Sequence, residues 1–225
     1  LLEPMWGGWE GNTGWDENWC CTGDGETFGF YNPHPEYDSE EVHDYAKKKG
    51  IRIVGHHETG TQIANYESQL DSAFAYCQRN GIRVVKTGYV NDGSQNIKRI
   101  DENGILRREW HHGQFMVEHF RKVLETAAKY EVSLVVHEPI KDTGLRRTFP
   151  NMMSREGAKG QEFNGFMSSK DNNKPNHTTI IPFTRLLSSP MDYTPGIFNL
   201  VDYRYNSPED RKINPNHRIP STISK

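Results

Sequence analysis

Short runs of β-branched residues alternate with amphipathic helical patterns along this chain, and this alternation constrains the fold most. The runs are IRIVGHHE (51–58), IRVVKTGYV (82–90), SLVVHEP (133–139) and TTIIPFTR (178–185). Alternating strands and helices imply parallel strands with right-handed crossovers, and continuous Ile/Val runs imply strands covered on both faces. No G-x-G-x-x-G motif opens a predicted helix, so a (β/α)8 barrel is favoured over a dinucleotide-binding sheet.

Three helices are predicted, one before the first run and two between later runs. The segment SEEVHDYAKKKG (39–50) has Ser39 placed as an N-cap, acidic residues in its first turn, lysines in its last turn and Gly50 as its stop. A later helix is predicted from about Phe115 to Tyr130. The helix between them has apolar residues at helical spacing, namely Ile63, Tyr66, Leu70, Ala73, Phe74 and Cys77.

Polar side chains close every predicted strand. They are His56, His57 and Glu58 in the first, Lys86 and Thr87 in the second, His137 and Glu138 in the third, and Thr184 and Arg185 in the fourth. Catalytic residues of a barrel lie at the carboxyl ends of its strands, so these endings predict one functional rim. The competing interpretation is a salt bridge at the rim. It is disfavoured for Glu58 and Glu138, because each follows a histidine and neither has an obvious basic partner in its own loop.

Composition excludes several classes of protein. The net charge of -3 over 225 residues carries no nucleic-acid signature, and no apolar run is long enough to span a membrane. The three cysteines match neither a disulfide framework nor a zinc site, and H-E-x-x-H is absent from HETGT and HEPIK. The apolar fraction of 34% and the opening without methionine favour a piece of a longer protein.

Other polar and aromatic residues have structural interpretations. Arg52 and Arg185 are predicted to be ordinary loop residues. His111, His112 and His119 fall around the start of a helix, where a cap or a solvated face is expected. The aromatic-rich opening MWGGWEGNTGWDENW (5–19) suits core packing and sugar stacking equally well.

Three carboxylates call for a further explanation: Glu138, Glu156 and Glu162. The last two lie in SREGAKGQEFNG (154–165), which follows a Pro-Asn loop. Carboxylate oxygens without thiols are hard ligands, which suit Ca²⁺ better than zinc.

With these residues in view, the chain resembles the catalytic barrel of glycoside hydrolase family 97. The motifs that carry the resemblance occur in order: GHHETG…NYE, VKTGYV, EWHHGQ, VHEPI…TGLRRTFPN, REGAKGQEFNG and IIPFTRLLSSPMDYTPGIF. The resemblance implies that residues 1–225 form an incomplete (β/α)8 barrel, about strands 2–6. It places the family's N-terminal β-sandwich and C-terminal β domain outside this chain.

The resemblance also implies residue roles. Retaining α-galactosidases of the family carry a nucleophilic Asp at the end of the fourth barrel strand, where this chain has Gly88 in VKTG. The chain therefore resembles the inverting α-glucosidase branch, in which an acid protonates the leaving oxygen and a base activates water. By similarity Glu162 is the acid, Glu58 and Glu138 hold the water as general base, Glu138, Glu156 and Glu162 bind Ca²⁺, and His56, Lys86 and His137 contact the sugar.

The expected function is a calcium-dependent, inverting α-glucosidase that releases glucose from the non-reducing ends of α-gluco-oligosaccharides. The family suggests a bacterial periplasmic or secreted protein, with an oligosaccharide substrate and neither nucleic-acid binding nor membrane insertion. The alternatives are an α-galactosidase of the same family, a non-catalytic carbohydrate-binding protein or an inactive fragment. The oligomeric state stays open. The segment NDGSQNIKRIDENGILRRE (91–109) is longer than the family pattern, and a fourth calcium ligand would come from the N-terminal domain.

Overall fold

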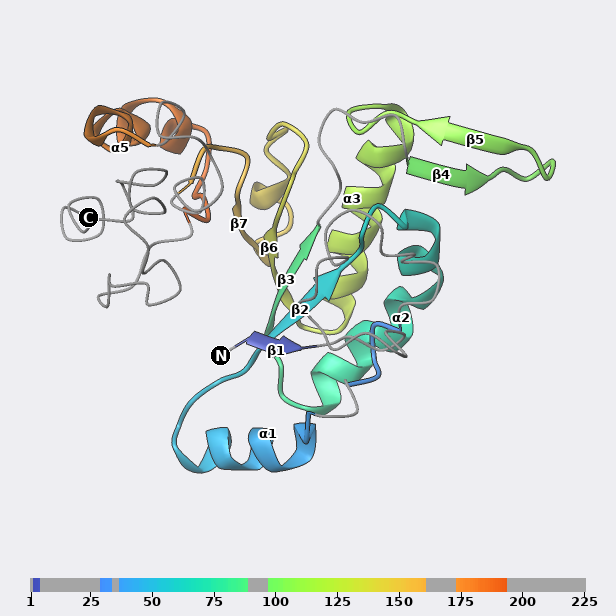
Figure 1. The fold of residues 1–225 in the computed structure, drawn as a ribbon, viewed down its shortest axis with the longest axis vertical. Coiled ribbons are helices and arrows are strands. Elements are labelled where there is room, and N and C mark those ends of the chain that lie inside the picture. Colours follow the sequence, from blue (N-terminus) through green and yellow to red (C-terminus); the bar gives the residue numbers. More distant parts are fainter. Residues whose placement is uncertain (1, 5–28, 34–36, 89–96, 161–172, 194–225) are drawn as a thin grey trace, which may run out of the picture. The chain divides into compact units, whose positions relative to one another are not determined.

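The structure, a computed structural model, describes residues 2–4, 29–33, 37–88, 97–160 and 173–193 (Figure 1). The chain divides into two compact units, Leu1–Arg155 and Glu156–Lys225. The elements described in the first unit are β1 (Leu2–Pro4), α1 (Ser39–Lys48), β2 (Val54–Glu58), α2 (Ile63–Arg79), β3 (Val84–Gly88), β4 (Ile97–Ile100), β5 (Leu106–Glu109), α3 (Gln114–Lys129), β6 (Ser133–Val136), the 3-10 helix η1 (Leu145–Arg147) and β7 (Met152–Arg155).

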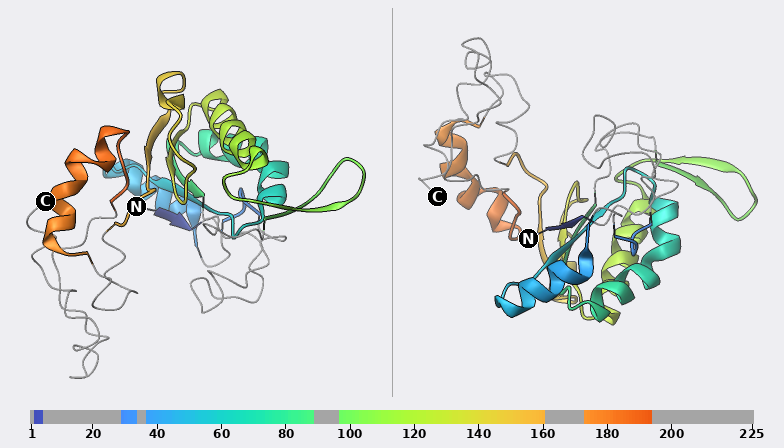
Figure 2. Two further views of the ribbon diagram at one scale, coloured as in Figure 1. Left: turned by 90° about the horizontal axis from the view of Figure 1, so that it is seen from above. Right: turned by 60° about the horizontal axis from the view of Figure 1, so that its bottom comes forward.

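A parallel sheet forms the centre of the first unit. Its five strands follow the order β1-β2-β3-β6-β7, and every neighbouring pair is parallel. Helices α2 and α3 lie side by side against one face of this sheet (Figures 1 and 2). The apolar core between them includes Tyr66 and Phe74 of α2, Leu124 of α3 and Leu134 of β6. This arrangement confirms the α/β class and is consistent with part of a barrel.

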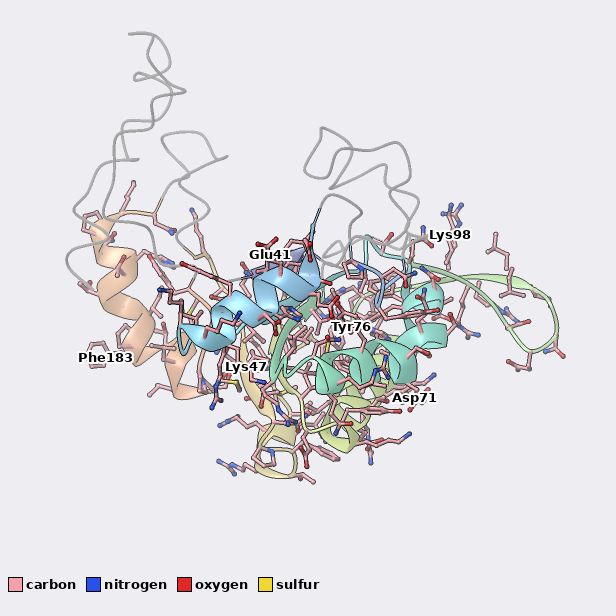
Figure 3. The ribbon with its side chains drawn as sticks, turned by 90° about the horizontal axis from the view of Figure 1, so that it is seen from below. Glu41, Lys47, Asp71, Tyr76, Lys98 and Phe183 are labelled. Carbon is pink, nitrogen blue, oxygen red and sulfur yellow. The ribbon has the colours of Figure 1, made fainter. Side chains whose placement is uncertain are left out.

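The helices agree closely with the sequence patterns. The buried residues of α2 are the six predicted from their spacing, and α3 begins and ends one residue before the predicted bounds. The predicted cap of α1 is wrong, because the Asp38 carboxylate, one residue earlier than Ser39, accepts the Glu41 amide at 2.9 Å. The outer faces of α1 and α2 carry exposed charges, such as Lys47 and Asp71 (Figure 3).

The long segment after β3 contains an antiparallel hairpin of β4 and β5 that extends away from the parallel sheet (Figure 2). Asp101 organises its turn: one carboxylate oxygen accepts the amides of Asn103 and Ile105 at 3.0 and 2.9 Å, and the other accepts Arg107 Nε at 2.7 Å. Buried Ile97 joins the hairpin to the core of the unit.

The described part of the second unit is helical. It contains α5 (Pro175–Ile180) and the 3-10 helices η2 (Ile181–Phe183) and η3 (Arg185–Leu187). The predicted strand TTIIPFTR is therefore wrong, and Thr184 and Arg185 end no strand. Proline suits the first turn of a helix but cannot donate to an interior strand, and Pro175 and Pro182 each lie at a helix start. The described helices include none both long and apolar enough to cross a membrane.

Candidate active site

Strands β2, β3, β6 and β7 end at the same edge of the sheet. Glu58 pairs in register with Gly88, Thr87 with Val136, and Val136 with Arg155. His137, which directly follows β6, therefore leaves the sheet at this edge. The polar endings of three of the four predicted strands therefore lie at this edge, whereas Thr184 and Arg185 end no strand.

The three predicted sugar contacts come together at this edge. His56 pairs in register with Lys86, and both His56 and His137 are 3% exposed. The pKa of His56 is lowered from 6.5 to about 3, chiefly by burial, with smaller electrostatic contributions from Lys86 and His137. His56 is therefore a neutral imidazole, which can donate one hydrogen bond and accept another.

Gly88 allows the ends of β3 and β6 to approach closely. Its φ is +131°, and a Cβ at this position would lie 2.8 Å from the carbonyl carbon and 2.9 Å from the amide nitrogen of His137. The His137 amide donates to the Thr87 carbonyl at 2.7 Å, and the Thr59 hydroxyl donates to the Gly88 carbonyl. Backbone atoms therefore occupy the space that any side chain at position 88 would need.

Glu138 has an unusual backbone conformation. Its φ is +36°, in the left-handed region that residues other than glycine rarely adopt. Such strain costs about 1–3 kcal/mol and persists where the surroundings over-determine the backbone, most often at functional sites. The outlier supports a functional role for the segment after β6.

The other predicted carboxylates are described to different extents. Glu58 is the last residue of β2. Glu156 directly follows Arg155 of β7 and is the first residue of the second unit. Glu162 and the aromatic-rich opening (5–19) lie outside the described residues. Glu138 and Glu156 carry carboxylate oxygens, hard donors of the type that Ca²⁺ prefers.

His57 lies on the opposite face of the sheet from His56, because side chains alternate along a strand. It is fully buried, and its Nδ1 lies 2.8 Å from the Tyr66 hydroxyl, which also accepts from the Thr87 hydroxyl at 3.1 Å. Burial lowers the pKa of His57 to about 3, with His56 adding to the effect, and burial raises the pKa of Tyr66. This polar cluster attaches β2 and β3 to α2. Counting alternate positions along β2 would have separated the two histidines.

Two of the three histidines around α3 are buried, against expectation. His119 is 3% exposed, and its Nδ1 lies 2.8 Å from a Glu67 carboxylate oxygen, whose other oxygen accepts from Lys122 Nζ at 2.7 Å. Burial lowers the pKa of His119, although Glu67 acts in the opposite direction. His111 is fully buried and packs edge-on against Phe120, with their ring centroids 6.0 Å apart. Only His112 is exposed as expected.

A parallel α/β sheet with histidines, a lysine and carboxylates at its strand ends has the arrangement of a barrel enzyme that acts on a polar substrate. The family Glycoside hydrolase 97 matches residues 9–158. The chain belongs to this family.

Solved relatives support the same assignment. A glycoside hydrolase family 97 enzyme from Pseudoalteromonas sp. strain K8 in complex with panose is 49% identical, with a TM-score of 0.75 over 84% of this chain. The complex with acarbose from the same source is 50% identical, with the same TM-score and coverage. The match spans 28% of each of those chains.

Curated relatives are more distant. The retaining α-galactosidase of Bacteroides thetaiotaomicron is 27% identical over 164 residues, which are 72% of this chain and 21% of the relative. The probable retaining α-galactosidase of Streptomyces bingchenggensis is 26% identical over 165 residues, 71% of this chain and 21% of the relative. The chain thus spans a small part of the proteins that it matches.

Proposed function

We propose that this chain is the barrel segment of a calcium-dependent, inverting α-glucosidase that releases glucose from the non-reducing ends of α-gluco-oligosaccharides. The observation that carries the proposal is Gly88. A retaining enzyme needs a nucleophile about 5–5.5 Å from its acid. Glycine offers none, and the His137 backbone leaves no space for an aspartate at the position where the retaining branch carries one.

The proposed roles follow from the family resemblance and the strand-end geometry. Glu162 acts as the acid that protonates the leaving oxygen, and Glu58 and Glu138 orient and deprotonate the attacking water. An inverting enzyme separates acid and base by about 6.5–9.5 Å so that water fits between base and sugar. His56, Lys86 and His137 hold the sugar hydroxyls, and the neutral imidazole of His56 is suited to this because it both donates and accepts.

Calcium is proposed to bind Glu138, Glu156 and Glu162. Bound there, it would offset the repulsion between the carboxylates and polarise sugar hydroxyls. In this proposal the carboxylates of Glu138 and Glu156 are two of the ligands. Glu162 needs a raised pKa to stay protonated near neutral pH, which requires apolar burial and nearby negative charge to outweigh the cation.

The relatives differ in the sugar that they bind or hydrolyse. Panose is built from α-linked glucose, and the enzyme solved with it is 49% identical to this chain. The α-galactosidases are only 26–27% identical. We therefore favour glucose, and the names of the curated relatives make an α-galactosidase of the same family the second candidate. A periplasmic or secreted location is proposed on the family resemblance alone.

The test uses the full-length protein, Ca²⁺ and two substrates, an α-glucoside and the matching α-galactoside, with the early product followed by NMR. We expect β-glucose to be released first and a chelator to abolish turnover. Early α-glucose, or a sugar trapped on a glutamate, would contradict inversion. Faster hydrolysis of the galactoside would select the second candidate.

Replacing Glu162 by glutamine tests the acid. The variant should lose roughly 10²–10⁴-fold in turnover of substrates with poor leaving groups. Activated aryl glucosides leave without protonation, so their turnover should fall much less. Equal losses on both substrates would leave Glu162 as a metal ligand only.

A further inference from the structure

The loop between β6 and β7 is drawn in Figure 1, and two side chains, those of Arg155 and Asp142, hold it. Arg155, the last residue of β7, and Asp142 have side chains that are 7% and 8% exposed. The Arg155 guanidinium donates to the Ile140 carbonyl at 2.8 Å, and its other terminal nitrogen lies 3.3 Å from Asp142 Oδ2. One planar group thus fastens the loop at two points.

Asp142 in turn organises the start of η1. Its Oδ1 accepts the Gly144 amide at 2.8 Å, and its Oδ2 also pairs with Arg146. Gly144 has a φ of +84°, which permits the tight turn. The aspartate therefore connects the turn, η1 and the end of β7.

The cavity beside Arg155 and Asp142 cannot hold a small-molecule ligand. Its volume is about 20 Å³, and its lining includes Phe120, Val136, Pro139, Leu145 and Met152. That volume holds roughly one water molecule. This cavity therefore has no room for a small-molecule ligand of Arg155 and Asp142.

We propose that Arg155 and Asp142 are positioning residues for Glu138. Glu138 lies between two backbone anchors: the His137 amide is bonded to the Thr87 carbonyl at 2.7 Å, and the Ile140 carbonyl is held by Arg155. The left-handed conformation of Glu138 persists only where the surroundings enforce it, and these anchors supply the restraint. The link to catalysis rests on the proposed function, in which Glu138 serves as base and calcium ligand.

The decisive variant is Arg155→Lys in the full-length protein. Lysine keeps the positive charge but cannot reproduce the planar fork that reaches both Ile140 and Asp142. The matched control is Arg83→Lys, because Arg83 also joins a neighbouring element, pairing with Glu131 at 2.9 Å, but through side chains that are 42% and 72% exposed.

Three readouts separate positioning from general stability. Amide hydrogen exchange in residues 137–147 should accelerate by at least about tenfold in Arg155→Lys, with the remaining peptides unchanged. The Kd for Ca²⁺, measured by calorimetry, should rise roughly 10–100-fold. The kcat for α-glucosides with poor leaving groups should fall by about the same factor, with KM changed much less. Arg83→Lys should change none of these.

Loop exchange and calcium affinity in Arg155→Lys equal to those of the control would overturn the proposal. If Arg155→Lys does not fold, Asp142→Asn replaces it, because asparagine keeps the acceptor for the Gly144 amide and loses the charge. Asp142→Asn should show the same changes at smaller size. If it shows no change, the proposal is overturned. A wild-type protein that neither binds Ca²⁺ nor hydrolyses α-glucosides would refute the proposed function. Faster exchange confined to residues 137–147 would still support the positioning role.

Discussion

His56 and His57 are neighbours on β2 and equally hidden from solvent, yet they belong to different parts of the molecule. They are 3% and 0% exposed, and burial lowers the pKa of each to about 3. His57 faces α2 and bonds to Tyr66, whereas His56 faces the edge where the charges of Lys86 and His137 act on it. Burial and pKa alone therefore do not distinguish the two histidines, whereas the groups that surround each of them do.

The largest effect is expected at the strand ends, from Gly88→Asp. This substitution would supply the residue type that the retaining branch carries at this position. The structure leaves no room for it, because even a Cβ would lie 2.8 Å from the His137 carbonyl carbon. The variant should displace His137 and Glu138, and activity should fall by more than about 100-fold, since small misplacements of catalytic groups have effects of that size.

Gly88→Ala should show nearly the same loss, because the Cβ alone causes the clash. The matched control is Gly81→Ala, whose φ is +73° but whose Cβ would meet nothing within 4 Å. It should lose some stability and keep its activity. A Gly88→Asp enzyme that gained retaining activity would contradict the close approach described here.

The next prediction compares the replacement of each of the two histidines by asparagine. His56→Asn should lower kcat/KM by about 10–100-fold, the effect of losing hydrogen bonds to substrate, with a small change in stability. His57→Asn should lower the free energy of unfolding by roughly 2–3 kcal/mol, because the Tyr66 hydroxyl loses one of its two partners in a buried cluster. Activity assays and urea denaturation of both variants measure the contrast. Equal losses of stability would remove it.

Tyr66→Phe sharpens the structural half of this comparison. It removes only the hydroxyl that joins His57 and Thr87, so we expect a loss of about 1–3 kcal/mol in stability. Turnover should stay within a few-fold of the wild type under stabilising conditions. Tyr45→Phe, at a tyrosine that is 61% exposed, is the control and should change neither quantity. A large fall in kcat for Tyr66→Phe would place the cluster in catalysis.

The last prediction concerns a pH dependence that both histidines share. Their folded pKa of about 3 lies below the unfolded value of 6.5, so the unfolded chain binds more protons between these limits. Each histidine's contribution to the free energy of unfolding is fully present above pH 6.5. It is lost as the pH falls towards 3, at up to about 1.4 kcal/mol per pH unit. His57→Asn should reduce the slope of unfolding free energy between pH 5 and 6.5. An unchanged slope would contradict a buried neutral His57.

Some elements of the fold could be predicted from the sequence and others could not. The spacing of apolar residues predicted the buried face of α2 completely, because a helix repeats every 3.6 residues whatever it packs against. The Ile/Val runs correctly predict strands β2, β3 and β6. The run TTII wrongly predicts a strand, because the same residues also suit a short helix that begins at a proline. Strand β7 was missed because Met152–Arg155 contains no β-branched residue.

By itself the sequence determined the parallel α/β class, the helix faces, the polar strand ends and the absence of a side chain at position 88. All of these depend on local periodicity or residue type. Only the tertiary structure decided that Gly88 is closed off by the His137 backbone, that His57 belongs to the α2 cluster, and that Arg155 holds the loop carrying Glu138. These contacts join residues far apart in the chain, so they arise from strand register and packing, which no local pattern encodes.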